Sequence, residues 1–243
     1  MFSKRIVSCL LLASALTVSA QDKLTLSSGV VQEGAIVKVD ANNVTLRMAA
    51  GEIAFPRKDI TKIEIKKPAE VDAALKAPET KKFAEAIPVL KAVTERYLNL
   101  PEPWVQQAWA VLGDSQAASG QWTAAITTYT KLLEMFPQGA YAVKAKVGLS
   151  QGLVQEKKYG DAQKLLETAI EPLRKQLIVS PEENFFLGTA MIVLGDCYQQ
   201  QGELAKALDC YLSTVVLYYR DENAVREAQK KADEVKAKLK SSA

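Results

Sequence analysis

The chain has 243 residues, with 31 Lys and Arg against 28 Asp and Glu, a formal net charge of +3 and no histidine. A charge this close to zero argues against an electrostatic footprint for nucleic acid. The absence of histidine removes the commonest general base and the commonest metal ligand. The length allows one large or two modest domains.

Residues 1–20 have the pattern of a secretory signal peptide. Lys4 and Arg5 precede a short apolar run, and Val18-Ser19-Ala20 offers small residues before a cut at Gln21. The run is too short for a stable membrane span, although an uncleaved anchor is the alternative. Cys9 lies inside the run and not at the cut, so we do not expect a lipid anchor. The pattern predicts an exported chain, periplasmic or extracellular, with 31 − 2 = 29 basic against 28 acidic residues after cleavage.

Residues 21–67 alternate between apolar and polar side chains in short runs. Turn signals at Ser28-Gly29, Asn42-Asn43 and Ala50-Gly51 separate these runs. The spacing predicts four or five strands in a small antiparallel sheet or barrel. The order of strands, turns and the Asp59-Ile60 stretch resembles an Sm-like or SH3-like module. The RNA binding of some Sm-like proteins does not carry over, because the basic residues here are scattered.

Residues 68–98 look helical. We expect a short helix over 70–77, a stop at 78–80 with Thr80 capping the next helix, and then a helix with Phe83, Ala86 and Leu90 on one face. Pro88 should kink that helix.

The clearest pattern follows over residues 100–139. Its members fall at positions 4, 7, 8, 15, 17, 20, 24 and 32 of a frame of about 34 residues: Trp109, Leu112, Gly113, Gly120, Trp122, Ala125, Tyr129 and Pro137. This pattern resembles the tetratricopeptide repeat (TPR), which is a helix–turn–helix unit. We expect Trp109 to be core, and Gly120 to end the first helix in a left-handed conformation.

Two further units follow in the same frame. The third is weak, with Ser150 in place of the crossing glycine and Lys157-Lys158 in place of the turn glycine. In the fourth, Val193-Leu194-Gly195-Asp196 repeats Val111-Leu112-Gly113-Asp114. Residues 221–243 form a predicted helix that caps the last unit, with a self-association seam as the alternative. Cys197 and Cys210 are expected to be free, buried thiols.

In the TPR family the first helix of each unit lines the concave binding surface. Carried over by frame position, the resemblance implies the following surface: Gln107, Ala110, Asp114, Ala117, Ala118, Lys144, Val147, Gln151, Val154, Gln155, Thr189, Ile192, Asp196, Gln199 and Gln200. Of these we select Gln107, Asp114, Lys144, Gln151, Gln155, Asp196, Gln199 and Gln200 as candidate partner-binding residues. An amide-rich surface suits an extended peptide; the alternative is that these are only solvated helix residues.

Together the sequence predicts an α+β chain, mainly α: a β-module, about four TPR-like helix pairs over 68–220 and a capping helix. The chain resembles exported bacterial TPR proteins of the Tol–Pal cell-division coordinator and outer-membrane assembly lipoprotein types. It lacks the N-terminal coiled coil of the first and the lipid-bearing cysteine of the second. We expect a non-catalytic envelope scaffold for a protein or peptide partner, with no cofactor, no metal, no nucleic acid and no membrane span after cleavage. A self-assembling structural protein is the alternative.

Overall fold

The computed structural model describes residues 22–175 and 180–241, and the side chains of 181–183 are outside the description. The chain divides into two compact units. The first ends at Lys66; the second begins at Lys67, with residues 38–40 grouped with it. The predicted signal peptide lies outside the described residues.

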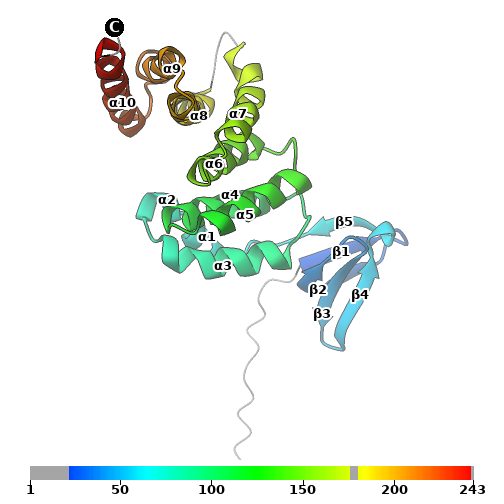
Figure 1. Ribbon diagram of the computed structural model, residues 1–243. Coiled ribbons are helices and arrows are strands. Elements are labelled where there is room, and N and C mark those ends of the chain that lie inside the picture. Colours follow the sequence, from blue (N-terminus) through cyan, green and yellow to red (C-terminus); the bar gives the residue numbers. More distant parts are fainter. Residues whose placement is uncertain (1–21, 176–179, 242–243) are drawn as a thin grey trace, which may run out of the picture. The chain divides into compact units, whose positions relative to one another are not determined.

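The first unit is a five-stranded sheet (Figure 1). Its strands are β1 (Asp22–Leu26), β2 (Val31–Val39), β3 (Asn43–Met48), β4 (Gly51–Pro56) and β5 (Ile60–Glu64), with the 3-10 turn η1 (Arg57–Asp59) between the last two. The order is β4-β3-β2-β1-β5, so β4 and β5 are its ends. β1 pairs antiparallel with β2 and β5, and β3 with β4. The predicted small antiparallel sheet is confirmed.

Alternation along the strands places one face of this sheet in a small core. Leu24, Ile36, Val44 and Leu46 are fully buried. The buried Asp22 carboxylate joins two segments, because Oδ2 accepts a hydrogen bond from the Ile36 amide at 2.8 Å and Oδ1 accepts one from the Lys66 amide at 3.1 Å.

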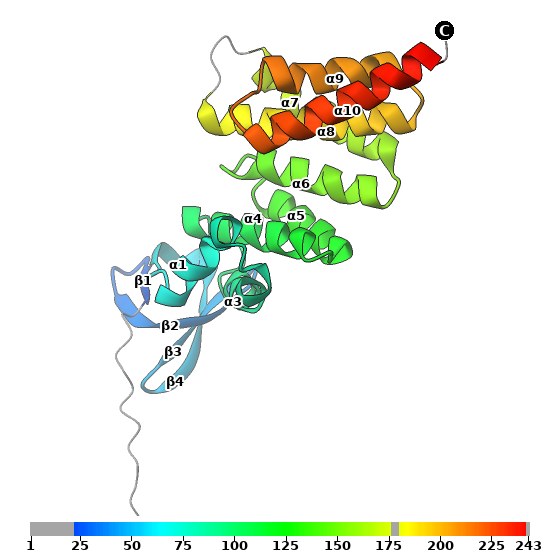
Figure 2. The same ribbon diagram turned by 90° about the vertical axis from the view of Figure 1, so that its left-hand side faces the viewer.

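The second unit is helical. Its helices are α1 (Ala69–Leu75), α2 (Ala77–Thr80), α3 (Phe83–Arg96), α4 (Pro103–Ala118), α5 (Trp122–Met135), α6 (Ala142–Gln155), α7 (Tyr159–Arg174), α8 (Pro181–Gln200), α9 (Leu204–Val216) and α10 (Glu222–Ser241). From α3 onward each helix packs on the next. In addition α4 contacts α6, α6 contacts α8 and α8 contacts α10. These four helices therefore form one layer of the hairpin stack (Figure 2).

The first hairpin differs in detail from the sequence prediction. Its first half is two short helices, α1 and α2, and α3 continues through Pro88. The prediction that Thr80 caps α3 is wrong. Thr80 is the last residue of α2, and its hydroxyl donates to the Lys76 carbonyl, while α3 begins after Lys82 without a side-chain cap.

In each of the three later hairpins, a residue of the turn has a left-handed backbone conformation. Gly120 and Gly202 end α4 and α8 with φ of 75° and 81°. In the third hairpin Lys157 takes the same left-handed conformation, with φ of 60°. A lysine therefore carries a backbone conformation that favours glycine.

The terminal helix α10 packs its apolar stripe inward. Ala224, Ala228, Ala232 and Val235 are buried in a cluster with Ile192 of α8 and with Ala207 and Tyr211 of α9. In Figure 2, α10 lies along α9 and α8. The helix thus covers the last hairpin, and its apolar stripe is already in use.

Candidate groove on the layer of α4, α6, α8 and α10

Two neighbouring cavities open on this layer, and several predicted binding residues line them. The first, which we call the α6–α8 cavity, has a volume of about 280 Å³. It is lined by Trp122, Gln151, Val154, Gln155, Thr189, Ile192, Val193, Asp196, Asp221, Asn223, Ala224 and Glu227.

The second, the α4 cavity, has a volume of about 350 Å³. It is lined by Pro78, Lys81, Phe83, Asp114, Ala117, Ala118, Trp122, Tyr129 and Gln151. Trp122 and Gln151 border both cavities, so the two adjoin, and we call them together the groove.

The candidate residues divide between groove and surroundings. Asp114, Gln151, Gln155 and Asp196 line the groove. The four that line neither cavity are Gln107, Lys144, Gln199 and Gln200.

Three apolar positions that the repeat frame placed on the binding surface belong to the core; Ile192, at 5% exposed, still lines the α6–α8 cavity, and the other two line neither cavity. Ala110 and Val147 are 0% and 4% exposed. Both belong to helices of the stacked layer, where positions between neighbouring helices are covered by the next hairpin.

In the hairpins α4–α5 and α8–α9, a triad of polar side chains connects the hairpin to the helix that follows it. In the first triad the Tyr129 hydroxyl donates to Asp114 Oδ1 at 2.7 Å, and Lys144 Nζ lies 2.5 Å from Asp114 Oδ2. Asp114 is on α4, Tyr129 on α5 and Lys144 on α6. The triad therefore joins a hairpin to the next one.

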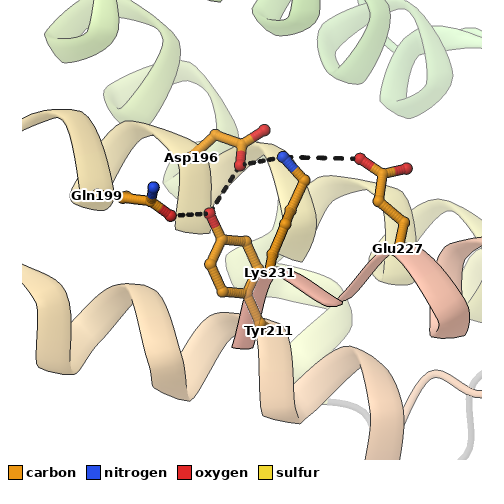
Figure 3. Close-up of polar contacts among 5 residues, drawn as sticks. All are labelled: Asp196, Gln199, Tyr211, Glu227 and Lys231. Carbon is orange, nitrogen blue, oxygen red and sulfur yellow. Dashed lines mark hydrogen bonds and ion pairs between the residues drawn. The ribbon is translucent and has the colours of Figure 1, made fainter. Parts of the chain in front are cut away.

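The second triad has the same construction (Figure 3). The Tyr211 hydroxyl donates to Asp196 Oδ1 at 2.7 Å, and Lys231 Nζ lies 2.7 Å from the same oxygen. Lys231 also lies 3.7 Å from Glu227 Oε1, and Gln199 Oε1 is 3.1 Å from the Tyr211 hydroxyl. Since Lys231 is on α10, the terminal helix supplies the contact that the next hairpin supplies in the first triad.

Glycine makes room for each tyrosine. A Cβ on Gly113 would lie 2.4 Å from the Tyr129 ring, and one on Gly195 would lie 2.5 Å from the Tyr211 ring. Burial raises the pKa of both tyrosines, and the adjacent Asp114 and Asp196 carboxylates raise it further. Both hydroxyls therefore keep their protons and remain donors at neutral pH.

The third hairpin lacks this construction. Ser150 replaces the glycine, Gln151 the aspartate and Leu166 the tyrosine. The side chains of Gln151 and Gln155, one helical turn apart on α6, make no hydrogen bond to any described residue. The α6–α8 cavity opens beside these uncommitted amides.

Trp122 is a groove residue that sequence reasoning missed. The repeat frame treats it as a packing position, yet its half-buried side chain borders both cavities. The repeat frame carries no signal for this place, because it depends on how neighbouring hairpins are spaced.

The described residues hold no group of three or more His, Cys, Asp or Glu side chains that could bind a metal ion. Cys197 and Cys210 are free and buried, as predicted. Burial raises the pKa of the Cys197 thiol to about 11 and that of Cys210 to about 12, so neither is an activated nucleophile. Within the part of the chain that the structure covers, no helix has the length and hydrophobicity of a membrane span.

Part of the chain is similar to a known protein family. Residues 71–140 match the tetratricopeptide repeat family model. No curated protein matches the chain.

Solved structures that resemble the helical unit include MamA, residues 41 to the end, from Desulfovibrio magneticus RS-1. It has 17% identity and a TM-score of 0.48 over 72% of this chain and 98% of that one. BtubC from P. vanneervenii has 13% identity and a TM-score of 0.48 over 69% and 78%. The matched residues include α2 to α5, which are therefore similar to a tetratricopeptide repeat. The Gly–Asp–Tyr packing of α4 and α5 recurs in α8 and α9, outside the matched residues.

Proposed function

We propose that the chain is a non-catalytic scaffold of the bacterial cell envelope that binds an extended segment of a protein partner in the groove. The observation that carries the proposal is that Gln151 and Gln155 line the α6–α8 cavity with side-chain amides that make no hydrogen bond to any described residue. A carboxamide both donates and accepts hydrogen bonds, so it matches the backbone of an extended peptide without requiring one sequence.

The triads support a separation between residues that pack the hairpins together and residues that bind the partner. Asp114 and Lys144 contribute to the packing of hairpins through their contact with each other, and Asp196 does so through its Oδ1 contacts with Tyr211 and Lys231. The residues that we propose to bind the partner's backbone are then Gln151 and Gln155, with Trp122 beside them and Gln107 and Gln200 as outlying candidates. Gln199 lies beside Tyr211 and supports the second triad.

Site-specific photocrosslinking in the source cell tests the proposal. A photoreactive amino acid at Gln151 or Gln155 should capture a discrete partner. The matched control carries the photoreactive amino acid at Lys164, which is exposed on α7 and lines neither cavity. Capture from position 164 and not from 151 or 155 would refute a role for the groove.

Export is part of the proposal and needs its own test. The charged start, apolar run and small residues of 1–20 support it. We expect the protein from the envelope fraction to begin at Gln21 on N-terminal sequencing. A protein that starts at Met1 or fractionates with the cytoplasm would contradict export.

We propose further that the first unit is an Sm-like or SH3-like module. The order β4-β3-β2-β1-β5, with η1 before β5, supports this assignment. The edge strand β4 favours the second candidate function, self-assembly, because Ile53 on it is 42% exposed. Sedimentation of the wild-type chain and of Ile53→Lys compares the candidates: a monomer in both argues against self-assembly, and an oligomer only in the wild type supports it.

A further inference from the structure

The second triad leaves acidic oxygens open where the first leaves none. Asp114 uses Oδ1 for Tyr129 and Oδ2 for Lys144. Asp196 uses Oδ1 for both Tyr211 and Lys231, so its Oδ2 has no partner among the described residues (Figure 3). Glu227 likewise contacts Lys231 only through Oε1, at 3.7 Å.

The charge around the α6–α8 cavity is unbalanced. Asp196, Asp221 and Glu227 line it, and no lysine or arginine does. Lys231 compensates for part of this charge from beside the cavity. Asp221 accepts hydrogen bonds from the Asn223 and Ala224 amides at the start of α10, and both bonds go to its Oδ1. Each of the three acidic side chains therefore keeps an open oxygen at the cavity; those of Asp196 and Glu227 lie on either side of Lys231.

An aromatic ring at the same cavity also favours a positively charged ligand. Trp122 borders it and makes no ring or ion contact with any described residue. Cations are attracted to the face of tryptophan more strongly than to any other aromatic side chain. A guanidinium can stack on a ring and also donate to a carboxylate, so aromatic and acidic groups around one cavity select the same kind of ligand.

We infer that the α6–α8 cavity binds an arginine or lysine side chain of the partner segment. The cation donates to Asp196 Oδ2 and to Glu227 and lies against Trp122, while Gln151 and Gln155 hold the adjoining backbone. This inference rests on the proposed function, because it names the chemistry of the segment that the groove takes.

A random heptapeptide display library, selected against the immobilised protein as purified from cells, tests the inference. We expect enriched peptides to share an arginine or lysine at one position. In fluorescence anisotropy with the enriched peptides, Glu227→Gln should weaken binding at least fivefold. Replacing the peptide's cation with norleucine should have an effect of similar size. Glu134→Gln, a matched change at an exposed position of α5 outside both cavities, should leave the affinity unchanged.

The outcomes separate this inference from the proposed function. Peptides without a common cation that still lose affinity with Gln151→Ala would overturn the cation site and leave groove binding in place. Peptides that bind independently of Gln151, Gln155 and Glu227, or a selection that enriches none, would overturn the cation site and count against the groove as well.

Discussion

The Tyr211 hydroxyl donates a hydrogen bond to Asp196 over 2.7 Å, and this contact reproduces the one between Tyr129 and Asp114 two hairpins earlier. In both cases a lysine from the following helix approaches the same carboxylate. The repeated Leu-Gly-Asp sequence thus encodes a structural element, in which glycine leaves room for the tyrosine ring and aspartate accepts a hydrogen bond from the tyrosine hydroxyl.

The close approach of ring and backbone predicts the effect of adding a methyl group. Gly113→Ala and Gly195→Ala should each lower the free energy of unfolding by about 1–3 kcal/mol, because the new Cβ would overlap a buried tyrosine ring. Urea denaturation measures the change. The control is Gly160→Ala in the first turn of α7, where a Cβ meets nothing within 4 Å. We expect that variant to be neutral or slightly stabilised, and equal losses at all three glycines would contradict the packing.

The two tyrosines predict a loss of stability at alkaline pH. Their folded pKa values are raised above the ordinary value of 10.0, so the unfolded chain releases these protons first as the pH rises. The stability they contribute is complete below pH 10 and falls above it, by about 1.4 kcal/mol per pH unit for each tyrosine. Urea denaturation from pH 8 to 11.5 should therefore show a steeper decline in the wild type than in Tyr129→Phe/Tyr211→Phe, and parallel declines would count against the two donors.

The left-handed Lys157 predicts that the third turn can be improved. Lys157→Gly removes a strained conformation but increases the freedom of the unfolded chain. The net effect should lie between zero and a gain of about 1 kcal/mol in the free energy of unfolding. The reverse change, Gly120→Ala at φ of 75°, should cost about 1 kcal/mol or more. A large loss on Lys157→Gly would mean that the lysine side chain is needed there.

The burial of α10 predicts that its inner face is essential to the fold. Val235 is fully buried, so Val235→Asp places a charge in an apolar cluster and should lower the free energy of unfolding by about 3 kcal/mol or more. Lys230→Asp on the exposed side of the same helix should change it by less than about 0.5 kcal/mol. If the Val235→Asp chain is soluble and fully stable but no longer self-associates, the result would instead favour the alternative in which residues 221–243 form a contact between two copies of the chain.

The repeat frame anticipated which residues are buried more reliably than which ones are available to a partner. Trp109, Tyr129 and Ala125 are core as expected, because their sizes and spacing are set by how helices cross. The frame also placed Asp114 and Asp196 on the groove, but it could not show that a tyrosine and a lysine from other helices engage them. Such contacts depend on three-dimensional stacking and on the reach of a lysine from a separate element.

Two other features were beyond the sequence for related reasons. The break of the first hairpin into α1 and α2 depends on local packing, which overrides the capping preference of Thr80. The place of Trp122 between two cavities depends on the spacing of neighbouring hairpins, which no single repeat specifies.

The indole signal of Trp122 offers the most direct test of the proposed groove. The chain has three tryptophans, so the Trp122 signal in a ¹H–¹⁵N spectrum can be assigned with Trp122→Phe. Titration with the partner captured by photocrosslinking should shift this signal saturably and leave the signal of the buried Trp109 in place, and Gln151→Ala/Gln155→Ala should weaken the titration at least fivefold. A partner that binds with full affinity to both proteins while the Trp122 signal stays still would show that the groove is not the binding site.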